Sequence, residues 1–173
     1  MRVELAREIY NTSYLRGQFH LRSGSISNEY FDKYLFESEP HLLKEIANEM
    51  SQLIPDETEV IAGLEMGGIP IVTALSLITN KKASFVRKRA KEYGTCKIAE
   101  GAKVSGKNVC VIEDVVTTGG QIIKSVEELR NQGAIITTVL CVLQRNEEAY
   151  EILVKENLEL KPLFTMEYIE TLI

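Results

Sequence analysis

The segment Val109-Cys-Val-Ile-Glu-Asp-Val-Val-Thr-Thr-Gly-Gly-Gln121 joins three local patterns in one short stretch. Its apolar, β-branched start predicts a central parallel strand that is covered by helices on both faces. Two carboxylates, Glu113 and Asp114, end this strand, and a turn of hydroxyl and glycine residues leads into a helix expected at 122–130. Backbone N–H groups at such a turn and helix start favour an anion. The segment therefore predicts a phosphate site with an acidic edge.

The two carboxylates restrict what this site can bind. Glu113 and Asp114 would repel a phosphate unless they hold something else, such as sugar hydroxyls or a metal ion. A ligand with a phosphate at one end and a diol in the middle satisfies both halves. The Gly-Gly pair alone is equally compatible with an ordinary strand, turn and helix whose acids are solvated caps.

The complete string resembles the signature of the type I phosphoribosyltransferases, which bind phosphoribosyl pyrophosphate (PRPP). Gln121 is a departure, because the family usually has a small residue there. The resemblance implies that Glu113 and Asp114 hold the ribose hydroxyls and that the residues after them hold the donor's phosphate. These donor-binding residues are Val115, Val116, Thr117, Thr118, Gly119, Gly120 and Gln121.

Composition is ordinary for a globular protein. The chain has 173 residues, of which 45% are hydrophobic and 26% charged, so we expect one domain with a substantial core. The net charge of −5 argues against broad nucleic-acid binding. Cys96, Cys110 and Cys141 lack metal-like spacing, which favours reduced thiols in a cytoplasm. No apolar run is long enough to cross a membrane, and the N-terminus lacks a signal-peptide core.

The N-terminal part predicts a helix over Val3–Leu15 and then two short strands, at 17–24 and 27–33, which on pattern alone form an edge hairpin. With the signature above, the string Phe-His-Leu-Arg-Ser-Gly resembles the N-terminal hood of orotate phosphoribosyltransferases. The resemblance implies that Arg22 reaches the base or the pyrophosphate. It also implies that Tyr30 and Phe31 line the base pocket.

A second strand, loop and helix unit follows the helix expected at 38–53, for which Ser38 is the predicted N-cap. Its loop contains Met66, Gly67 and Gly68, and it would lie beside the first site at the carboxyl edge of the sheet. A structural turn is the alternative. The resemblance implies a pyrophosphate-binding loop that works through backbone N–H groups. Some relatives carry a lysine where this chain has Gly67.

A basic segment, Arg87 to Lys97, separates two expected buried strands. Such a run is usually a solvated face, yet in an acidic protein it also suits a ligand with several phosphates. It resembles the catalytic loop of orotate phosphoribosyltransferases, with Tyr93 in place of histidine. The resemblance implies that Arg87, Lys88, Lys91 and Tyr93 contact PRPP and that Lys91 serves the neighbouring subunit of a dimer.

The strand expected at 134–143 ends next to Arg145. An arginine at a strand end is more often a surface ion-pair residue. The resemblance instead implies that Arg145 grips the carboxylate of orotate through a two-pronged contact, with Thr117 also near the base. A helix at 147–156, a strand at 163–165 and a helix from Met166 complete the chain.

Together these patterns predict an α/β fold: a doubly wound parallel sheet at about 38–160 and a small hood, mainly 1–35 with C-terminal elements, in one domain of 1–173. The implied activity is transfer of ribose 5-phosphate from PRPP to orotate in pyrimidine (UMP) synthesis. Lys91, Glu113 and Asp114 are the expected catalytic residues, and Mg²⁺ is held mainly by the substrate, near Glu113 and Asp114. We expect a cytoplasmic homodimer that binds no nucleic acid or membrane. A transferase for another base, such as a purine, and a non-catalytic PRPP-sensing regulator are the alternatives.

Overall fold

A six-stranded sheet forms the centre of the molecule, whose computed structural model describes residues 2–20, 24–89 and 98–173. The strand order is β5-β4-β3-β6-β7-β8, and every neighbouring pair is parallel except β4 and β5. The strands are β3 (Val60–Leu64), β4 (Lys82–Val86), β5 (Ala99–Gly101), β6 (Asn108–Val116), β7 (Ile135–Gln144) and β8 (Glu159–Thr165). The predicted parallel sheet is confirmed. The short antiparallel strand β5 was not predicted.

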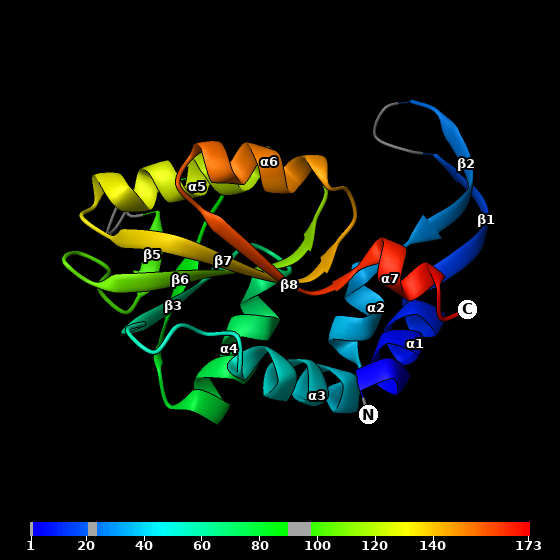
Figure 1. Cartoon of the computed structure of the whole chain (residues 1–173), viewed down its shortest axis with the longest axis horizontal. Helices are drawn as coiled ribbons and strands as arrows, with labels where there is room; N and C mark the ends of the chain where they lie inside the picture. Colours follow the sequence, from blue (N-terminus) through cyan, green and yellow to red (C-terminus); the bar gives the residue numbers. More distant parts are fainter. Residues whose placement is uncertain (1, 21–23, 90–97) are drawn as a thin grey trace.

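Helices cover both faces of this sheet. Figure 1 shows α3 (Pro40–Ser51) and α4 (Gly68–Thr79) on one side and α5 (Gly120–Asn131) and α6 (Glu148–Lys155) on the other. Strand β6 serves both layers, because successive side chains of a strand point to opposite faces. Cys110 and Ile112 join the cluster on the α3 and α4 side, whereas Val109 and Val111 join the cluster beneath α5 and α6. This is the reason for the continuous apolar run in the sequence.

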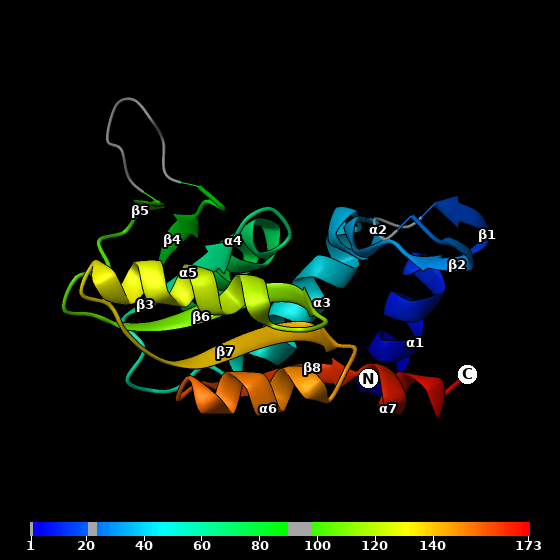
Figure 2. The ribbon, with the colours of Figure 1, turned by 90° about the horizontal axis from the view of Figure 1, so that it is seen from above.

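The hood lies at one end of the sheet, as Figures 1 and 2 show. Helix α1 leads directly into an antiparallel hairpin that begins with the pair Tyr14 and Phe31. The C-terminus joins this group, since Arg7 Nε donates a hydrogen bond to the carbonyl of Leu172 at 3.0 Å. The hood elements are α1 (Arg2–Ser13), β1 (Tyr14–His20), β2 (Ile26–Phe31), α2 (Lys33–Ser38) and α7 (Met166–Glu170).

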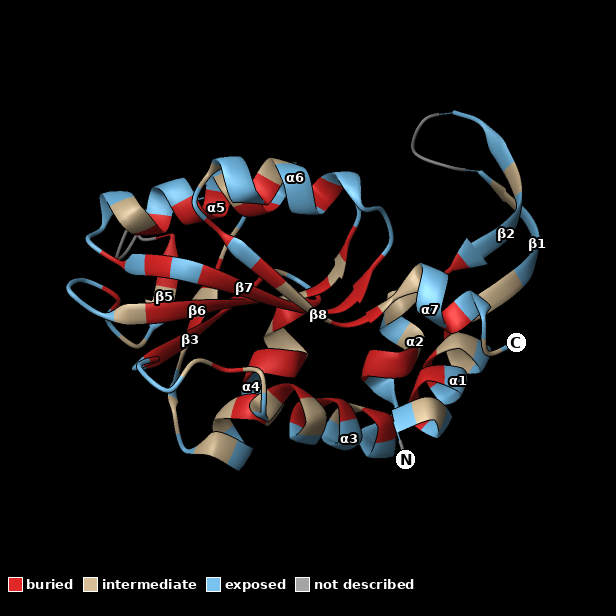
Figure 3. Cartoon of the chain, in the orientation of Figure 1, coloured by how far each residue is buried: buried red, intermediate tan, exposed pale blue. Residues whose placement is uncertain are grey.

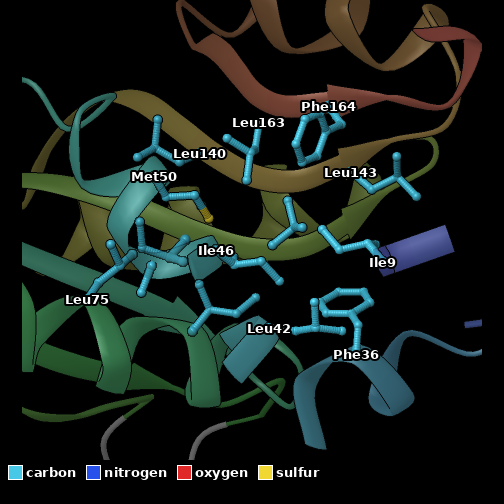
Figure 4. Close-up of a cluster of buried hydrophobic side chains, with 14 of the residues drawn as sticks. Ile9, Phe36, Leu42, Ile46, Met50, Leu75, Leu140, Leu143, Leu163 and Phe164 are labelled. Carbon is cyan, nitrogen blue, oxygen red and sulfur yellow. The ribbon is translucent and has the colours of Figure 1, made fainter. Parts of the chain in front are cut away.

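One apolar cluster runs from the hood into the sheet layer. Figure 3 shows buried residues on the helices of the hood, on α3 and α4 and along the strands, and Figure 4 shows side chains of this cluster. Ile9 and Phe36 come from the hood, while Ile46 and Leu140 come from α3 and β7; all four are fully buried. The hood is therefore fixed to the sheet by shared packing.

Three expectations about the N-terminal third need correction. The first helix ends at Ser13 and not at Leu15, because the hairpin pairing starts at Tyr14. Helix α2 was not predicted. Ser38 is its last residue, where the Ser38 hydroxyl donates to the carbonyl of Leu35 at 2.9 Å, so the N-cap position of α3 falls to Glu39, which makes no side-chain cap bond.

One detail near the central segment also differs from expectation. Strand β6 continues to Val116, so Glu113 and Asp114 lie inside the strand and not at its end. In the first turn of α5, Ile122 is buried and Ile123 is partly buried against the same cluster. Among the described residues, no helix is long and apolar enough to span a membrane.

Candidate active site

A polar cavity of about 360 Å³ opens at the carboxyl ends of β3 and β6. Open α/β sheets bind ligands at this edge. Residues from four separate parts of the chain line it, and most were predicted from the sequence to bind the donor. The lining consists of Lys33, Tyr34, Glu65, Met66, Lys88, Glu113, Asp114, Val115, Val116, Thr117, Thr118, Gly119, Gln121 and Ile122.

The turn between β6 and α5 forms one wall of the cavity. Gly119 has a φ of +78°, the left-handed region that residues with a side chain rarely adopt, and it is the N-cap of α5. This turn leaves the hydroxyl-bearing residues Thr117 and Thr118 exposed to solvent. The 12-residue helix α5 begins here, so its unpaired N–H groups and its dipole favour a phosphate at this wall.

The two carboxylates at the centre of the cavity differ in environment. Asp114 is fully buried, and its Oδ1 accepts a hydrogen bond from the backbone N–H of Val115 at 2.5 Å. Glu113 is partly exposed, and its Oε1 accepts from the backbone N–H of Asp114 at 2.9 Å. Burial alone would raise the pKa of Asp114, but hydrogen bonds with Glu113 and Lys33 and the positive charge of Lys33 hold that pKa below its ordinary value. Burial, followed by hydrogen bonding and repulsion from Asp114, raises the pKa of Glu113. Asp114 therefore carries a negative charge more readily than Glu113 does.

Helix α2 brings two further charged residues to Asp114. Lys33 Nζ lies 2.5 Å from Asp114 Oδ2. Glu37 is buried one turn further along, and burial together with the charge of Asp114 raises its pKa to about 9. Sequence reasoning missed both residues because it missed the helix. A spacing of four residues places two side chains on one helix face, so Lys33 and Glu37 carried a usable signal.

The loop after β3 approaches the carboxylates closely. A Cβ atom at Gly67 would lie 1.5 Å from Asp114 Oδ2, so only glycine fits this position while Asp114 keeps its place. The peptide bond between Glu65 and Met66 is cis. The backbone N–H of Lys88 donates to Glu65 Oε1 at 2.5 Å and joins this loop to the end of β4. Gly67 and Gly68 are buried and do not line the cavity, whereas Met66 does.

A second cavity, of about 330 Å³, is lined by three of the residues that were predicted from the sequence to bind the base. Tyr30, Phe31 and Arg145 line it together with residues of α1 and α7. Its wall also carries two carboxylates, and one of them, Glu29, accepts a hydrogen bond from the hydroxyl of Tyr14. The remaining lining residues are Tyr10, Ser27, Met166 and Glu170.

Arg145 links the two cavities. Its backbone N–H donates a hydrogen bond to the carbonyl of Val116 at 2.8 Å. This bond places Arg145, which lines the second cavity, beside the end of β6, where the turn to α5 begins. The Arg145 side chain is exposed, and its guanidinium forms no ion pair or hydrogen bond with the residues that the structure describes. Such a group is suited to a planar carboxylate. Thr117 was predicted to contact both PRPP and the base, but it lines only the first cavity.

Several predicted residues are not brought into either cavity. Arg87 is partly buried and its backbone N–H donates to the carbonyl of Ile98 at 2.8 Å, but its side chain lines neither cavity. Gly120 begins α5 behind the turn. Arg22, Lys91 and Tyr93 lie outside the described residues.

The side chains that line the first cavity provide only some of the ligands that a metal ion needs. Within residues 2–20, 24–89 and 98–173, no group of three or more histidine, cysteine or carboxylate side chains could hold a metal ion. Glu113 and Asp114 are nevertheless adjacent at the cavity. Mg²⁺ is commonly held by one or two carboxylates while phosphates and waters supply its other ligands. The site therefore fits a cation that arrives with a phosphate-bearing ligand.

Comparison with known proteins gives a consistent result. Residues 36–165 match the family model described as the phosphoribosyl transferase domain. An orotate phosphoribosyltransferase of a Nocardioides species is 48% identical over 161 residues, which cover 93% of this chain and 90% of that protein. Another, from Methanocaldococcus jannaschii, is 42% identical over 155 residues, covering 90% and 88%.

The fold agrees with the same group of proteins. The crystal structure of Mycobacterium tuberculosis orotate phosphoribosyltransferase in complex with PRPP superposes with a TM-score of 0.82. The two chains are 27% identical, and the match covers 98% of each. At this coverage the aligned part of the chain includes both the hood and the sheet.

Proposed function

The chain belongs to the phosphoribosyl transferase domain family, and from this membership we propose that it transfers ribose 5-phosphate from PRPP to orotate. The products are orotidine 5′-monophosphate and pyrophosphate, and the reaction is a step of pyrimidine synthesis. Relatives at 48% and 42% identity carry the name of this activity.

One observation supports orotate as the acceptor base. The Arg145 guanidinium, without a protein partner among the described residues, shares a cavity with Tyr30 and Phe31. Orotate is a planar ring with a carboxylate, so the aromatic side chains provide a surface for the ring and the arginine provides a two-pronged contact for the carboxylate. Purine bases have no carboxylate and would leave this arginine without a partner.

The first cavity suits the donor. We propose that Glu113 and Asp114 bind the ribose hydroxyls and that the turn from Thr117 to Gln121 binds the 5-phosphate. Arg87, Lys88 and the loop Met66–Gly68 would bind the diphosphate, with Lys91 and Tyr93 contributing from the basic segment. Arg22, on the hood, would complete the contacts to the base or the diphosphate.

The reaction requires charge stabilisation more than a protein nucleophile. As the C1–O bond to the diphosphate breaks and the C1–N1 bond to orotate forms, positive charge develops on the ribose ring, as in glycoside cleavage. Glu113 and Asp114 line the cavity, and their negative charge would stabilise the positive charge on the ribose ring. Lysine and arginine side chains stabilise the departing diphosphate.

Mg²⁺ is the proposed cofactor. When bound, it would neutralise the negative charge of the diphosphate. Glu113 is the protein carboxylate best placed to contact it, because Asp114 is fully buried and paired with Lys33. Most of its ligands would be oxygens of the donor.

The proposed assembly is a cytoplasmic homodimer in which Lys91 acts in the neighbouring subunit's site. The support is the resemblance of Arg87 to Gly94 to the catalytic loop of orotate phosphoribosyltransferases. The proposed partners are the two small-molecule substrates, with no nucleic acid or membrane. Mixing Lys91→Ala and Arg145→Ala protein tests the assembly, because subunits that share sites would regain activity well above that of either variant alone.

The activity itself is tested by following orotate consumption by ultraviolet absorbance with PRPP and Mg²⁺. We expect Arg145→Ala to lower kcat/KM for orotate about 10- to 100-fold, because a charge-assisted contact is lost, while KM for PRPP changes little. Lys155→Ala, on an exposed part of α6, is the control. Donor binding without orotate turnover, combined with turnover of adenine or hypoxanthine, would overturn the base assignment.

A further inference from the structure

Lys33 is the one lysine of helix α2, and it lies between the hood and the donor cavity. Its ammonium group is 2.5 Å from Asp114 Oδ2 and 5.4 Å from the centre of the Tyr34 ring. About a third of its side chain, 34%, remains exposed, and the residue lines the cavity next to Glu65 and Met66. Lys33 is thus paired with a carboxylate and is still partly exposed where it lines the cavity.

The loop Met66–Gly68, which we propose binds the diphosphate, contains no lysine, and with Asp114 in its present position a side chain at residue 67 does not fit. A Cβ atom at Gly67 would meet Asp114 Oδ2 at 1.5 Å and Glu37 Oε1 at 2.8 Å. The oxygen that excludes a side chain at 67 is the same Asp114 oxygen that Lys33 contacts. The positive charge at this point of the site therefore comes from α2 and not from the loop.

The charges of the described residues favour such a group. Among the described residues that line the cavity, three carboxylates, from Glu65, Glu113 and Asp114, outnumber the ammonium groups of Lys33 and Lys88. An anionic ligand entering this space would be repelled unless a cation moved toward it. Lys33 has four rotatable bonds in its stem and can turn from a carboxylate to a nearby phosphate oxygen without movement of the helix.

We propose that Lys33 is a donor-binding residue that supplies, from helix α2, the cation which Gly67 excludes from the diphosphate loop. It pairs with Asp114 before the donor binds and turns to the diphosphate oxygens of PRPP afterwards, which releases Asp114 to accept hydrogen bonds from the ribose hydroxyls. The inference rests on the proposed function, because it names a residue for the donor of that reaction.

The reverse reaction separates the two roles that Lys33 could have. Orotidine 5′-monophosphate carries the ribose and the 5-phosphate, and pyrophosphate carries the diphosphate. We expect Lys33→Met to raise KM for pyrophosphate about 10-fold or more, the loss of a charge-assisted hydrogen bond, and to leave KM for the nucleotide within about twofold. Lys33→Arg, which keeps the charge, should restore most of the pyrophosphate affinity. Lys44→Met, on the exposed face of α3, is the matched control.

Two outcomes would overturn the inference. If Lys33→Met raises KM for the nucleotide as much as KM for pyrophosphate, Lys33 acts only by holding Asp114. If neither KM changes, Lys33 has no part in donor binding. Calorimetric titration of each variant with pyrophosphate and Mg²⁺, and separately with orotidine 5′-monophosphate, gives the same comparison without turnover, so failure of the wild-type chain to use orotate would be recognised separately. Thermal unfolding of Lys33→Met and Lys33→Arg identifies any effect of lost stability.

Discussion

At the scale of single residues, the site depends on how closely Asp114 is enclosed. Its side chain contacts Lys33, has the backbone of Gly67 beside it, and lies against the buried carboxyl of Glu37. A buried carboxylate is unfavourable unless it is paired. Each neighbour of Asp114 therefore contributes both to stability and to the charge that the donor meets.

Gly67→Ala should be destabilising and should weaken donor binding. The added Cβ would overlap Asp114 Oδ2, and relief of such overpacking costs about 1–3 kcal/mol. Urea unfolding measures the first effect and KM for PRPP the second. Gly120→Ala is the stability control, because nothing lies within 4 Å of a Cβ there. Equal losses of stability in the two variants would show that the contact with Asp114 is not the cause.

Glu37 makes stability depend on pH. Burial and the nearby Asp114 charge raise its pKa to about 9, so the folded chain keeps a proton that the unfolded chain loses near pH 4.3. The folded state binds more protons over this window, so stability falls as pH rises from about 5 to 9, by at most about 1.4 kcal/mol per pH unit for one group. We expect a flatter profile in Glu37→Gln, measured by urea unfolding at pH 5, 7 and 9. Glu45→Gln, at an exposed position of α3, should keep the wild-type slope, and an unchanged slope in Glu37→Gln would contradict the assignment.

At the scale of elements, two junctions organise the site. The β6 to α5 junction presents the phosphate turn, and the β2 to α2 junction presents Lys33 and Glu37. In the second, Asp32 caps the helix, since its Oδ1 accepts from the backbone N–H of Tyr34 at 3.1 Å. This bond caps the short helix that carries Lys33 and Glu37.

Gly119→Ala should disturb the first junction. The residue has a φ of +78°, a conformation that costs a residue with a Cβ about 1–2 kcal/mol, and the new Cβ would lie 3.3 Å from Leu153 Cγ. We expect lower stability and a higher KM for PRPP, by thermal unfolding and steady-state kinetics. Gly119→Asn should lose less, because asparagine tolerates the left-handed region better. Alanine and asparagine variants of equal stability would argue against a backbone cause.

At the scale of the whole molecule, the hood and the sheet share one core. Leu5 and Ile9 of α1 belong to the same cluster of buried residues as Ile112 of β6 and Leu140 of β7. Figure 4 shows Ile9 and Phe36 facing Leu143 and Phe164. A shared core couples the position of the base cavity to that of the donor cavity, and it predicts that residues 1–173 unfold as one domain.

Ile9→Ala tests that coupling. Removal of a fully buried side chain costs about 2–5 kcal/mol. We expect the loss to appear equally in the hydrogen-exchange protection of α1 and of β7, because both unfold in one transition. Asn11→Ala, exposed on the same helix, should have little effect. Loss of protection confined to α1 would mean that the hood opens independently.

The sequence by itself determined the sheet, the turn between β6 and α5, and the position of Arg145 directly after β7. These are local features: an apolar β-branched run, a Thr-Thr-Gly-Gly turn before a helix, and an arginine directly after a strand. Short-range patterns also gave most element positions. Leu15 was wrongly placed in the first helix because it belongs to the hairpin, and Ser38 was wrongly predicted as an N-cap because it ends α2, which was not predicted.

Only the tertiary structure decided the surroundings of Asp114. Lys33 and Glu37 lie 81 and 77 positions from it in the chain, and nothing in their local sequence indicates that they meet Asp114. The sequence placed the loop of Gly67 beside the site but did not indicate the close contact of Gly67 with Asp114. Packing of α2 and the β3 loop against β6 brings them together, because the shared core fixes these elements side by side. Contacts of this kind arise from the summed burial of many residues, so no short pattern in the sequence records them.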